Sequence, residues 1–199
     1  MAIGLRGQLT SRTVHLCVDM QRIFSSDGLW PTPWMDRVLP VVTQLAESHP
    51  DRTVFTRFIT PAQPTDMPGM WQRYYEKWRN ATQERLDPSM LELMPSLQAL
   101  TPPATVIDKT RYSAFADSSL RAELTERAAD GLIITGSETD VCVLSTVLDA
   151  VDFGYRVILV RDGVCSSSDE GHDALLAVYH RRYSLQIETA DAADILDLW

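Results

Sequence analysis

Short apolar runs alternate with longer amphipathic segments along most of this chain. Continuous apolar runs are typical of strands buried on both faces, and the amphipathic segments have the spacing of helices that cover a sheet. The expected strands lie at 13–18, 53–58, 104–107, 132–135, 156–160 and 184–187. The expected helices lie at 35–48, 88–100, 118–129, 141–153, 171–183 and 190–198. This alternation predicts an α/β fold with three α/β/α layers, in which a six-stranded parallel sheet is doubly wound in a Rossmann-like manner.

The length of the chain is sufficient for one well-filled core and short for two. It has 199 residues, of which 45% are hydrophobic, and it contains no internal repeat and no tract that resembles an interdomain linker. We therefore predict a single domain over residues 1–199.

Residues 60–86 interrupt the alternation and are expected to form a variable, lid-like segment over a site. The segment contains three prolines and Gly69. Four aromatic residues follow among charged ones: Trp71, Tyr74, Tyr75 and Trp78. Because these aromatic residues have helical spacing, a packed amphipathic helix is as consistent with the pattern as a substrate lid.

Charge and cysteine content argue against several functional classes. A net charge of −9 without a basic run argues against nucleic acid or an anionic membrane as a partner and favours a small-molecule substrate. No run approaches the roughly 20 apolar residues of a membrane span, and the N-terminus has no apolar signal core. Cys17, Cys142 and Cys165 are odd in number and widely spaced, which indicates neither a disulfide framework nor a zinc cage. We expect a cytoplasmic protein with reduced thiols.

Three residues with chemically active side chains follow expected strands. Asp19 comes directly after the first strand, Lys109 follows the third, and Cys142 follows the fourth in the first turn of a helix. Ligands bind at the carboxyl ends of the strands in open α/β sheets, so these side chains are expected to form one cluster. An acid, an ammonium and a thiol suffice for acyl transfer, and helix-end amides are expected to lower the pKa of Cys142.

Each of these residues also has a structural interpretation. An aspartate after a strand is more often a turn or cap residue, a lysine is usually solvated, and Cys142 is as consistent with a small core residue as with a nucleophile. Cys17 lies inside an apolar run and is interpreted as core. Cys165 falls in an expected loop at 162–168 and is interpreted as structural.

Taken together, the segments resemble the isochorismatase-like cysteine hydrolase superfamily. The resemblance rests on motifs in the following order: 18–21 (Val-Asp-Met-Gln), 108–115 (Asp-Lys-Thr-Arg-Tyr-Ser-Ala-Phe), 139–143 (Thr-Asp-Val-Cys-Val), and then Arg161, Asp162, Ser166 and His172. It implies a six-stranded α/β fold and a catalytic triad of Asp19, Lys109 and Cys142. It also implies an oxyanion hole formed by the backbone N–H groups of Glu138 and Cys142, a cis peptide at Ser137–Glu138, and a homo-oligomer, either a dimer or a tetramer.

The same resemblance bears on the reaction. Nicotinamidases have an Asp-x-His metal segment after the second strand, where this chain has Thr-Arg-Phe-Ile-Thr at 56–60, so no metal and no cofactor are expected. Several isochorismatases have glycine in place of Cys142. The retained cysteine favours a metal-independent hydrolase that cleaves a C–N bond of a small amide, ureido or carbamoyl compound through a thioester. The alternatives are isochorismatase-type vinyl ether hydrolysis and a non-catalytic binding module of the same fold.

Substrate-binding candidates come from the motifs and from the aromatic residues of the lid-like segment. Arg111 is a candidate for bidentate carboxylate binding, although a structural salt bridge is equally consistent with its position. The complete set is Gln21, Arg111, Tyr112, Trp71, Tyr74 and Trp78.

Overall fold

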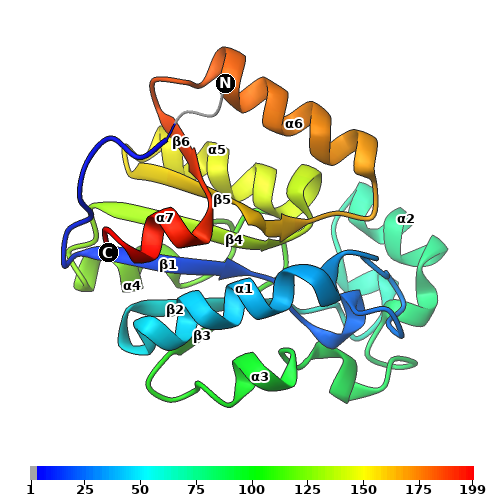
Figure 1. Cartoon of the computed structure of the whole chain (residues 1–199). Coiled ribbons are helices and arrows are strands. Elements are labelled where there is room, and N and C mark those ends of the chain that lie inside the picture. The colour runs from blue at the N-terminus through cyan, green and yellow to red at the C-terminus, as the bar shows by residue number, and fades with distance from the viewer. Residues whose placement is uncertain (1–3) are drawn as a thin grey trace.

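The computed structural model describes residues 4–199 and contains one six-stranded sheet in the order β3-β2-β1-β4-β5-β6 (Figure 1). Every neighbouring pair of strands is parallel. The strands are β1 Thr13–Val18, β2 Thr53–Phe58, β3 Thr105–Lys109, β4 Gly131–Ser137, β5 Arg156–Cys165 and β6 Ile187–Ala190. The predicted doubly wound α/β fold is confirmed. Because the chain winds outward in both directions from β1, its topological switch point lies between β1 and β4, where such sheets bind ligands.

Helices cover both faces of the sheet. They are α1 Met35–Ser48, α2 Met70–Lys77, α3 Pro95–Gln98, α4 Leu120–Glu126, α5 Leu144–Asp152, α6 Asp169–Arg182 and α7 Ala192–Leu196. Apolar residues of α4, α5 and α6 form one core cluster with the sheet. Residues of α1, α3 and α7 form two further clusters, and α1 and α7 lie in front of the sheet in Figure 1.

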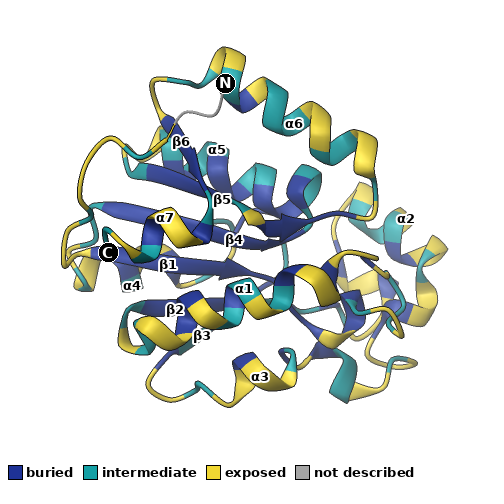
Figure 2. Cartoon of the chain, viewed as in Figure 1, coloured by how far each residue is buried: buried dark blue, intermediate teal, exposed yellow. Residues whose placement is uncertain are grey.

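Burial of the two layers follows from the sequence pattern. All six residues of β1 are buried, as expected for a central strand covered on both faces. In α1, Met35, Val38, Val42 and Leu45 recur at helical spacing and are buried, whereas the opposite side faces solvent. Figure 2 shows the same division, with dark strands inside and exposed stripes on the outer helices.

The predicted helix at 88–100 was wrong. This region contains a 3₁₀ turn at Pro88–Leu91 and the short helix α3. Pro95 has no backbone N–H and disfavours the helical conformation of the residue before it, and Met94 is accordingly extended at φ −55° and ψ 140°. A continuous helix therefore cannot pass this point.

The boundaries of β5 and β6 also differ from the predictions. β5 continues to Cys165 past a register shift opposite Ile134 and Gly136, so the first part of the predicted loop at 162–168 is strand. Cys165 is buried, in agreement with its structural interpretation. β6 begins at Ile187, three residues later than its predicted start at 184. No helix in residues 4–199 is long and apolar enough to cross a membrane.

The lid-like segment at 60–86 contains α2, flanked by short 3₁₀ turns. Tyr75 of α2 is fully buried in a small cluster with Met67 and Ala81, while Trp71, Tyr74 and Trp78 pack around it half-buried. The aromatic residues thus belong to a packed amphipathic helix, one of the two interpretations of their spacing.

His15 of β1 is expected to make the fold sensitive to acid. Its ring is fully buried, with Nε2 2.8 Å from Thr135 Oγ1, and burial lowers its pKa from 6.5 to about 3. Between pH 6.5 and about 3, the unfolded chain therefore binds a proton at His15 that the folded protein does not bind. The contribution of neutral His15 to the free energy of unfolding is complete above pH 6.5 and is lost as the pH falls towards 3.

We expect the free energy of unfolding to lose about 1.4 kcal/mol per pH unit in this window because of His15 alone. Urea denaturation between about pH 7 and pH 4 should show a shallower decline for His15→Gln. His180→Gln is the comparison and should change the slope less, since that imidazole is partly exposed and burial lowers its pKa to a smaller extent. Equal pH slopes for wild type and His15→Gln would contradict the prediction.

Candidate active site

Asp19 lies at the switch point of the sheet, directly after β1. It is fully buried and has a left-handed backbone with φ 52°, a conformation that aspartate adopts more readily than most residues. Thr56 of β2 donates a hydrogen bond to Asp19 Oδ1 at 2.6 Å and accepts one from the Asp19 N–H at 3.2 Å. These contacts fix the carboxylate against β2.

Gly136 allows β4 to approach β1 beside this carboxylate. Its φ is +112°, and a Cβ atom there would lie 2.0 Å from the Val18 carbonyl oxygen. Any side chain would therefore push β4 away from the residue that precedes Asp19.

Lys109 is the last residue of β3, and its side chain is fully buried. Its Nζ lies 2.6 Å from Asp19 Oδ2 and donates to the carbonyl oxygens of Arg111 at 2.9 Å and Tyr112 at 3.0 Å. Burial alone would lower the pKa of Lys109, but the neighbouring Asp19 carboxylate opposes this effect, and the pKa is raised above its ordinary value. Lys109 is therefore an ammonium whose N–H groups are directed at the carboxylate and two carbonyl groups.

Cys142 lies in the π-helical turn Thr139–Val143, which leads into α5. Its thiol lies beside Asp19 and Lys109, both of which influence its pKa, so the structure brings the three predicted residues together. Only 5% of the residue is exposed, and burial raises its pKa more than the neighbouring ammonium lowers it. The predicted lowering of the pKa by helix amides was therefore wrong, and the resting thiol is protonated.

The loop before Cys142 contains a cis peptide at Ser137–Glu138. The Glu138 carboxylate accepts hydrogen bonds from the backbone N–H of Ser167 at 3.1 Å and from its hydroxyl at 2.5 Å. These two contacts hold the side chain of Glu138 against the loop that follows β5.

A cavity of about 420 Å³ opens at Cys142. Of the residues predicted to act at a site, the lining includes Tyr74, Trp78, Tyr112, Glu138 and Cys142. The other lining residues were not predicted: Phe24, Leu29, Trp30, Pro31, Phe58, Val141 and Ser167. Several of them follow the carboxyl ends of β1, β2 and β5, so the reasoning that selected Asp19 would also have selected these segments.

Two predicted substrate-binding residues lie away from this cavity. Gln21 is fully buried, and its side chain accepts from the Phe58 N–H at 2.6 Å and donates to the Leu91 carbonyl at 2.8 Å. It therefore ties β1 to β2 and to the 3₁₀ turn at Pro88–Leu91. Trp71 lines a separate hollow with Met70, which shares only Tyr74 and Tyr112 with the main cavity.

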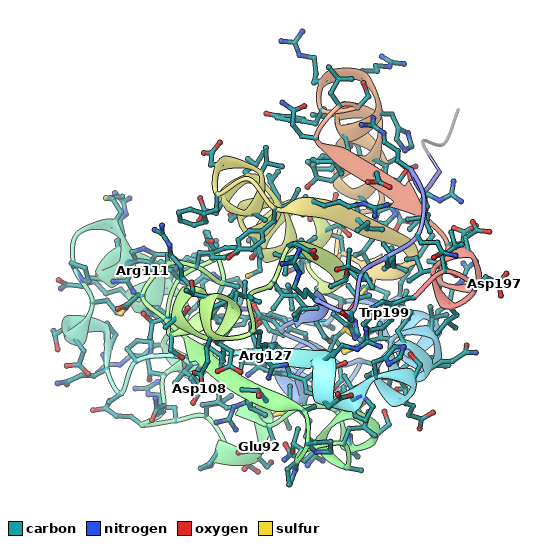
Figure 3. All side chains as sticks on the ribbon, turned by 90° about the vertical axis from the view of Figure 1, so that its left-hand side faces the viewer. Glu92, Asp108, Arg111, Arg127, Asp197 and Trp199 are labelled. Atoms are coloured by element: carbon teal, nitrogen blue, oxygen red, sulfur yellow. The ribbon has the colours of Figure 1, made fainter. Side chains whose placement is uncertain are left out.

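Arg111 also points away from the cavity. Its guanidinium donates to the hydroxyl and carbonyl groups of Thr110, lies 3.8 Å from Asp117, and packs over the ring of Trp71. Figure 3 shows Arg111 beside the α2 segment. These contacts fit the structural salt-bridge interpretation of Arg111 rather than bidentate binding of a substrate carboxylate.

The residues after β2 do not form the metal segment of nicotinamidases. Arg57 forms ion pairs with Asp108 and Glu92, each at 2.8 Å, and Figure 3 shows both carboxylates on the same side of the molecule. Within residues 4–199, no group of three His, Cys, Asp or Glu side chains is arranged to hold a metal ion. The donor set here does not fit such a site.

Comparison with known proteins identifies the family of this chain. Residues 13–191 match the family model of the isochorismatase domain. The chain belongs to the isochorismatase family. Relatives of this isochorismatase-family protein include two proteins named amidohydrolases and one named an amidase, each matched over less than half of this chain.

Two curated relatives and one crystal structure illustrate the likeness. The uncharacterized isochorismatase family protein PncA of Bacillus subtilis (strain 168) is 38% identical over 81 residues, covering 41% of this chain and 44% of the relative. The ureidoacrylate amidohydrolase RutB of Variovorax paradoxus (strain S110) is 42% identical over 57 residues, covering 29% of this chain and 23% of the relative. The matched region thus spans less than half the length of each relative. A cysteine hydrolase from Pseudomonas syringae pv. phaseolicola 1448A shares the fold, with TM-score 0.82 at 21% identity over 97% of this chain and 95% of that one.

The buried ion pair generates a prediction about stability. Lys109→Met should lower the free energy of unfolding by about 3–5 kcal/mol, because it leaves the Asp19 carboxylate buried without a counter-ion. Combining it with Asp19→Asn should recover most of this loss, since both charges are then absent. Urea denaturation near neutral pH measures both effects.

Arg12→Met is the matched control, because the Arg12–Asp130 pair has the same type of contact at 2.8 Å with side chains 58% and 30% exposed. It should cost less than about 1 kcal/mol. A loss in Lys109→Met no greater than that of Arg12→Met would show that the buried pair is not a tightly coupled unit.

Proposed function

We propose that this isochorismatase-family protein is a cysteine hydrolase that cleaves a C–N bond of a small amide, ureido or carbamoyl compound without a metal. The observation that carries the proposal is the position of the Cys142 thiol beside the buried Asp19–Lys109 pair, at the wall of the cavity. The relative RutB, named a ureidoacrylate amidohydrolase, supports C–N cleavage as the reaction type. Vinyl ether hydrolysis needs no nucleophile and would leave this arrangement unused.

The first step moves a proton within the cluster. Asp19 takes the thiol proton as Sγ attacks the carbonyl carbon, so a neutral acid and a thiolate replace a carboxylate and a thiol. The total charge of the buried group does not change, and Lys109 faces a negative partner before and after the transfer. The raised pKa of the resting thiol therefore does not prevent attack.

The attack forms a C–S bond and places negative charge on the former carbonyl oxygen. The backbone N–H groups of Glu138 and Cys142 are the proposed donors to this oxyanion. When the tetrahedral intermediate collapses, the C–N bond breaks, and the leaving nitrogen takes the proton from Asp19. Water then attacks the thioester and gives a proton to Asp19, and cleavage of the C–S bond returns that proton to the thiol and releases an acid.

Replacing the nucleophile should abolish turnover. Ammonia release from a panel of small amides, ureido acids and carbamoyl compounds, measured under chelator, should fall about a thousandfold or more in Cys142→Ala. Asp19→Asn should be similarly inactive, because the acceptor of the thiol proton is lost. Cys165→Ala is the matched control, since Cys165 is buried near the same strand ends but lies outside the cavity lining.

Near-normal release by folded Cys142→Ala would refute the proposed mechanism. If wild type released no ammonia from any member of the panel, C–N cleavage would lose its support. Ether hydrolysis and the binding module would then be tested next.

The two tryptophans of the lid-like segment provide a test of the cavity. Trp78 lines it, whereas Trp71 faces the separate hollow. We expect Trp78→Ala to raise KM about tenfold or more on the best substrate of the panel, because it removes an apolar wall. Trp71→Ala should change KM by less than about threefold. The reverse order of the two effects would assign the substrate to the other hollow.

A further inference from the structure

The charges around the cavity limit which chemical groups the non-reacting part of the substrate can have. Six of the cavity's twelve lining residues are aromatic: Phe24, Trp30, Phe58, Tyr74, Trp78 and Tyr112. Glu138 is the only carboxylate among the lining residues, and none of those residues is Lys, Arg or His. The lining therefore offers π faces and one negative charge.

The phenol and thiol groups of the lining do not add further charge near neutral pH. Burial raises the pKa of both Tyr74 and Tyr112. Burial likewise raises the pKa of Cys142. With Asp19 and Lys109 cancelling each other, the site has a net charge of about −1 from Glu138.

Two cations beside the site, Lys109 and Arg111, are already engaged. Lys109 directs its ammonium at Asp19 and at the carbonyl groups of Arg111 and Tyr112, so binding a substrate carboxylate would require it to give up one of these contacts. Arg111 is held by Thr110 and Asp117 outside the cavity. A substrate carboxylate would thus enter a largely apolar space whose lining contains a like charge and no cation, at a large desolvation cost.

The geometry of the rings suits a cation instead. Trp30 and Trp78 pack edge to face, with ring centroids 5.9 Å apart and planes at 81°, and the ring of Tyr74 lies 6.2 Å from that of Trp30 at 48°. Rings set at such angles can contact one ammonium group on more than one side, and tryptophan gives the strongest cation–π attraction. The exposed Lys77 already lies 5.6 Å from the Trp78 ring centroid without lining the cavity.

We propose that the substrate is a small amide whose non-reacting end is a cationic ammonium group, held by the aromatic walls of this cavity and by the Glu138 carboxylate. The proposal rests on the proposed function for the reacting end of the molecule. Ser167 acts as a positioning residue, because its two hydrogen bonds hold the carboxylate of Glu138. Substrates of the same length that end in a carboxylate are rejected.

Three amides of equal chain length provide the test. One ends in a trimethylammonium group, one in its uncharged tert-butyl isostere, and one in a carboxylate. Their affinities for Cys142→Ala are measured by calorimetry, so the result does not depend on turnover and is separate from the test of the proposed function. The trimethylammonium amide should bind about tenfold more tightly than the tert-butyl amide, and the carboxylate should bind most weakly.

Glu138→Gln in the same background tests the carboxylate while keeping the backbone N–H group. It should weaken binding of the cationic amide about fivefold or more and leave the tert-butyl amide unchanged. Glu84→Gln, at an exposed acid outside the cavity, is the matched control and should affect none of the three. The salt dependence of binding to Cys142→Ala itself gives a second measurement, since only the affinity of the cationic amide should fall at high ionic strength.

Three outcomes would overturn the proposal. In the first, the carboxylate or the tert-butyl amide binds as tightly as the cationic amide. In the second, folded Glu138→Gln keeps the full preference for the cationic amide. In the third, none of the three amides binds. Loss of ammonia release in Cys142→Ala together with any of these outcomes would leave the cysteine hydrolase intact and refute only the cationic substrate.

Discussion

The contact between Asp19 and Lys109 is the interaction on which the rest of the structure depends. Two charges taken out of water are costly unless their geometry is fixed and their remaining hydrogen-bonding groups are satisfied. Here a threonine of β2 holds the carboxylate, and the chain after β3 supplies two carbonyl groups to the ammonium. Meeting these conditions requires β1, β2 and β3 to be in a single register. The reactive cluster therefore forms only when β1, β2 and β3 are correctly paired, and its buried contacts in turn stabilise that pairing.

The same burial determines how the cluster behaves chemically. Surroundings that exclude water oppose any change in net charge, which is why the resting thiol keeps its proton. They do not oppose a transfer of that proton to a carboxylate within the same group. The aromatic walls extend these largely apolar surroundings from the cluster into the cavity that opens at Cys142. Affinity and reactivity are thus governed by the same exclusion of water.

The sequence predicted the parts of this molecule that depend on local pattern. β1, β2 and α1 have the predicted boundaries because their apolar periodicity is complete, and the strand-end rule brought Asp19, Lys109 and Cys142 together correctly. The roles of Gln21 and Arg111 depend on which neighbours satisfy their hydrogen bonds, which is a property of the tertiary structure. The direction of the thiol pKa was missed for a related reason. Spacing identifies a helix start but does not reveal that the thiol is closed off from solvent.

Tyr74 and Tyr112 separate the main cavity from the hollow that Met70 and Trp71 line. The partition is made of side chains, with no strand of the sheet in it, so the length of ligand that the protein accommodates is set by two rings. A smaller residue at either position would join the two spaces without disturbing the register that holds the ion pair. Substitutions at these two positions would change the size of ligand that fits and leave the reactive cluster in place. Proteins with this scaffold can therefore differ in their ligands while they keep the same chemistry.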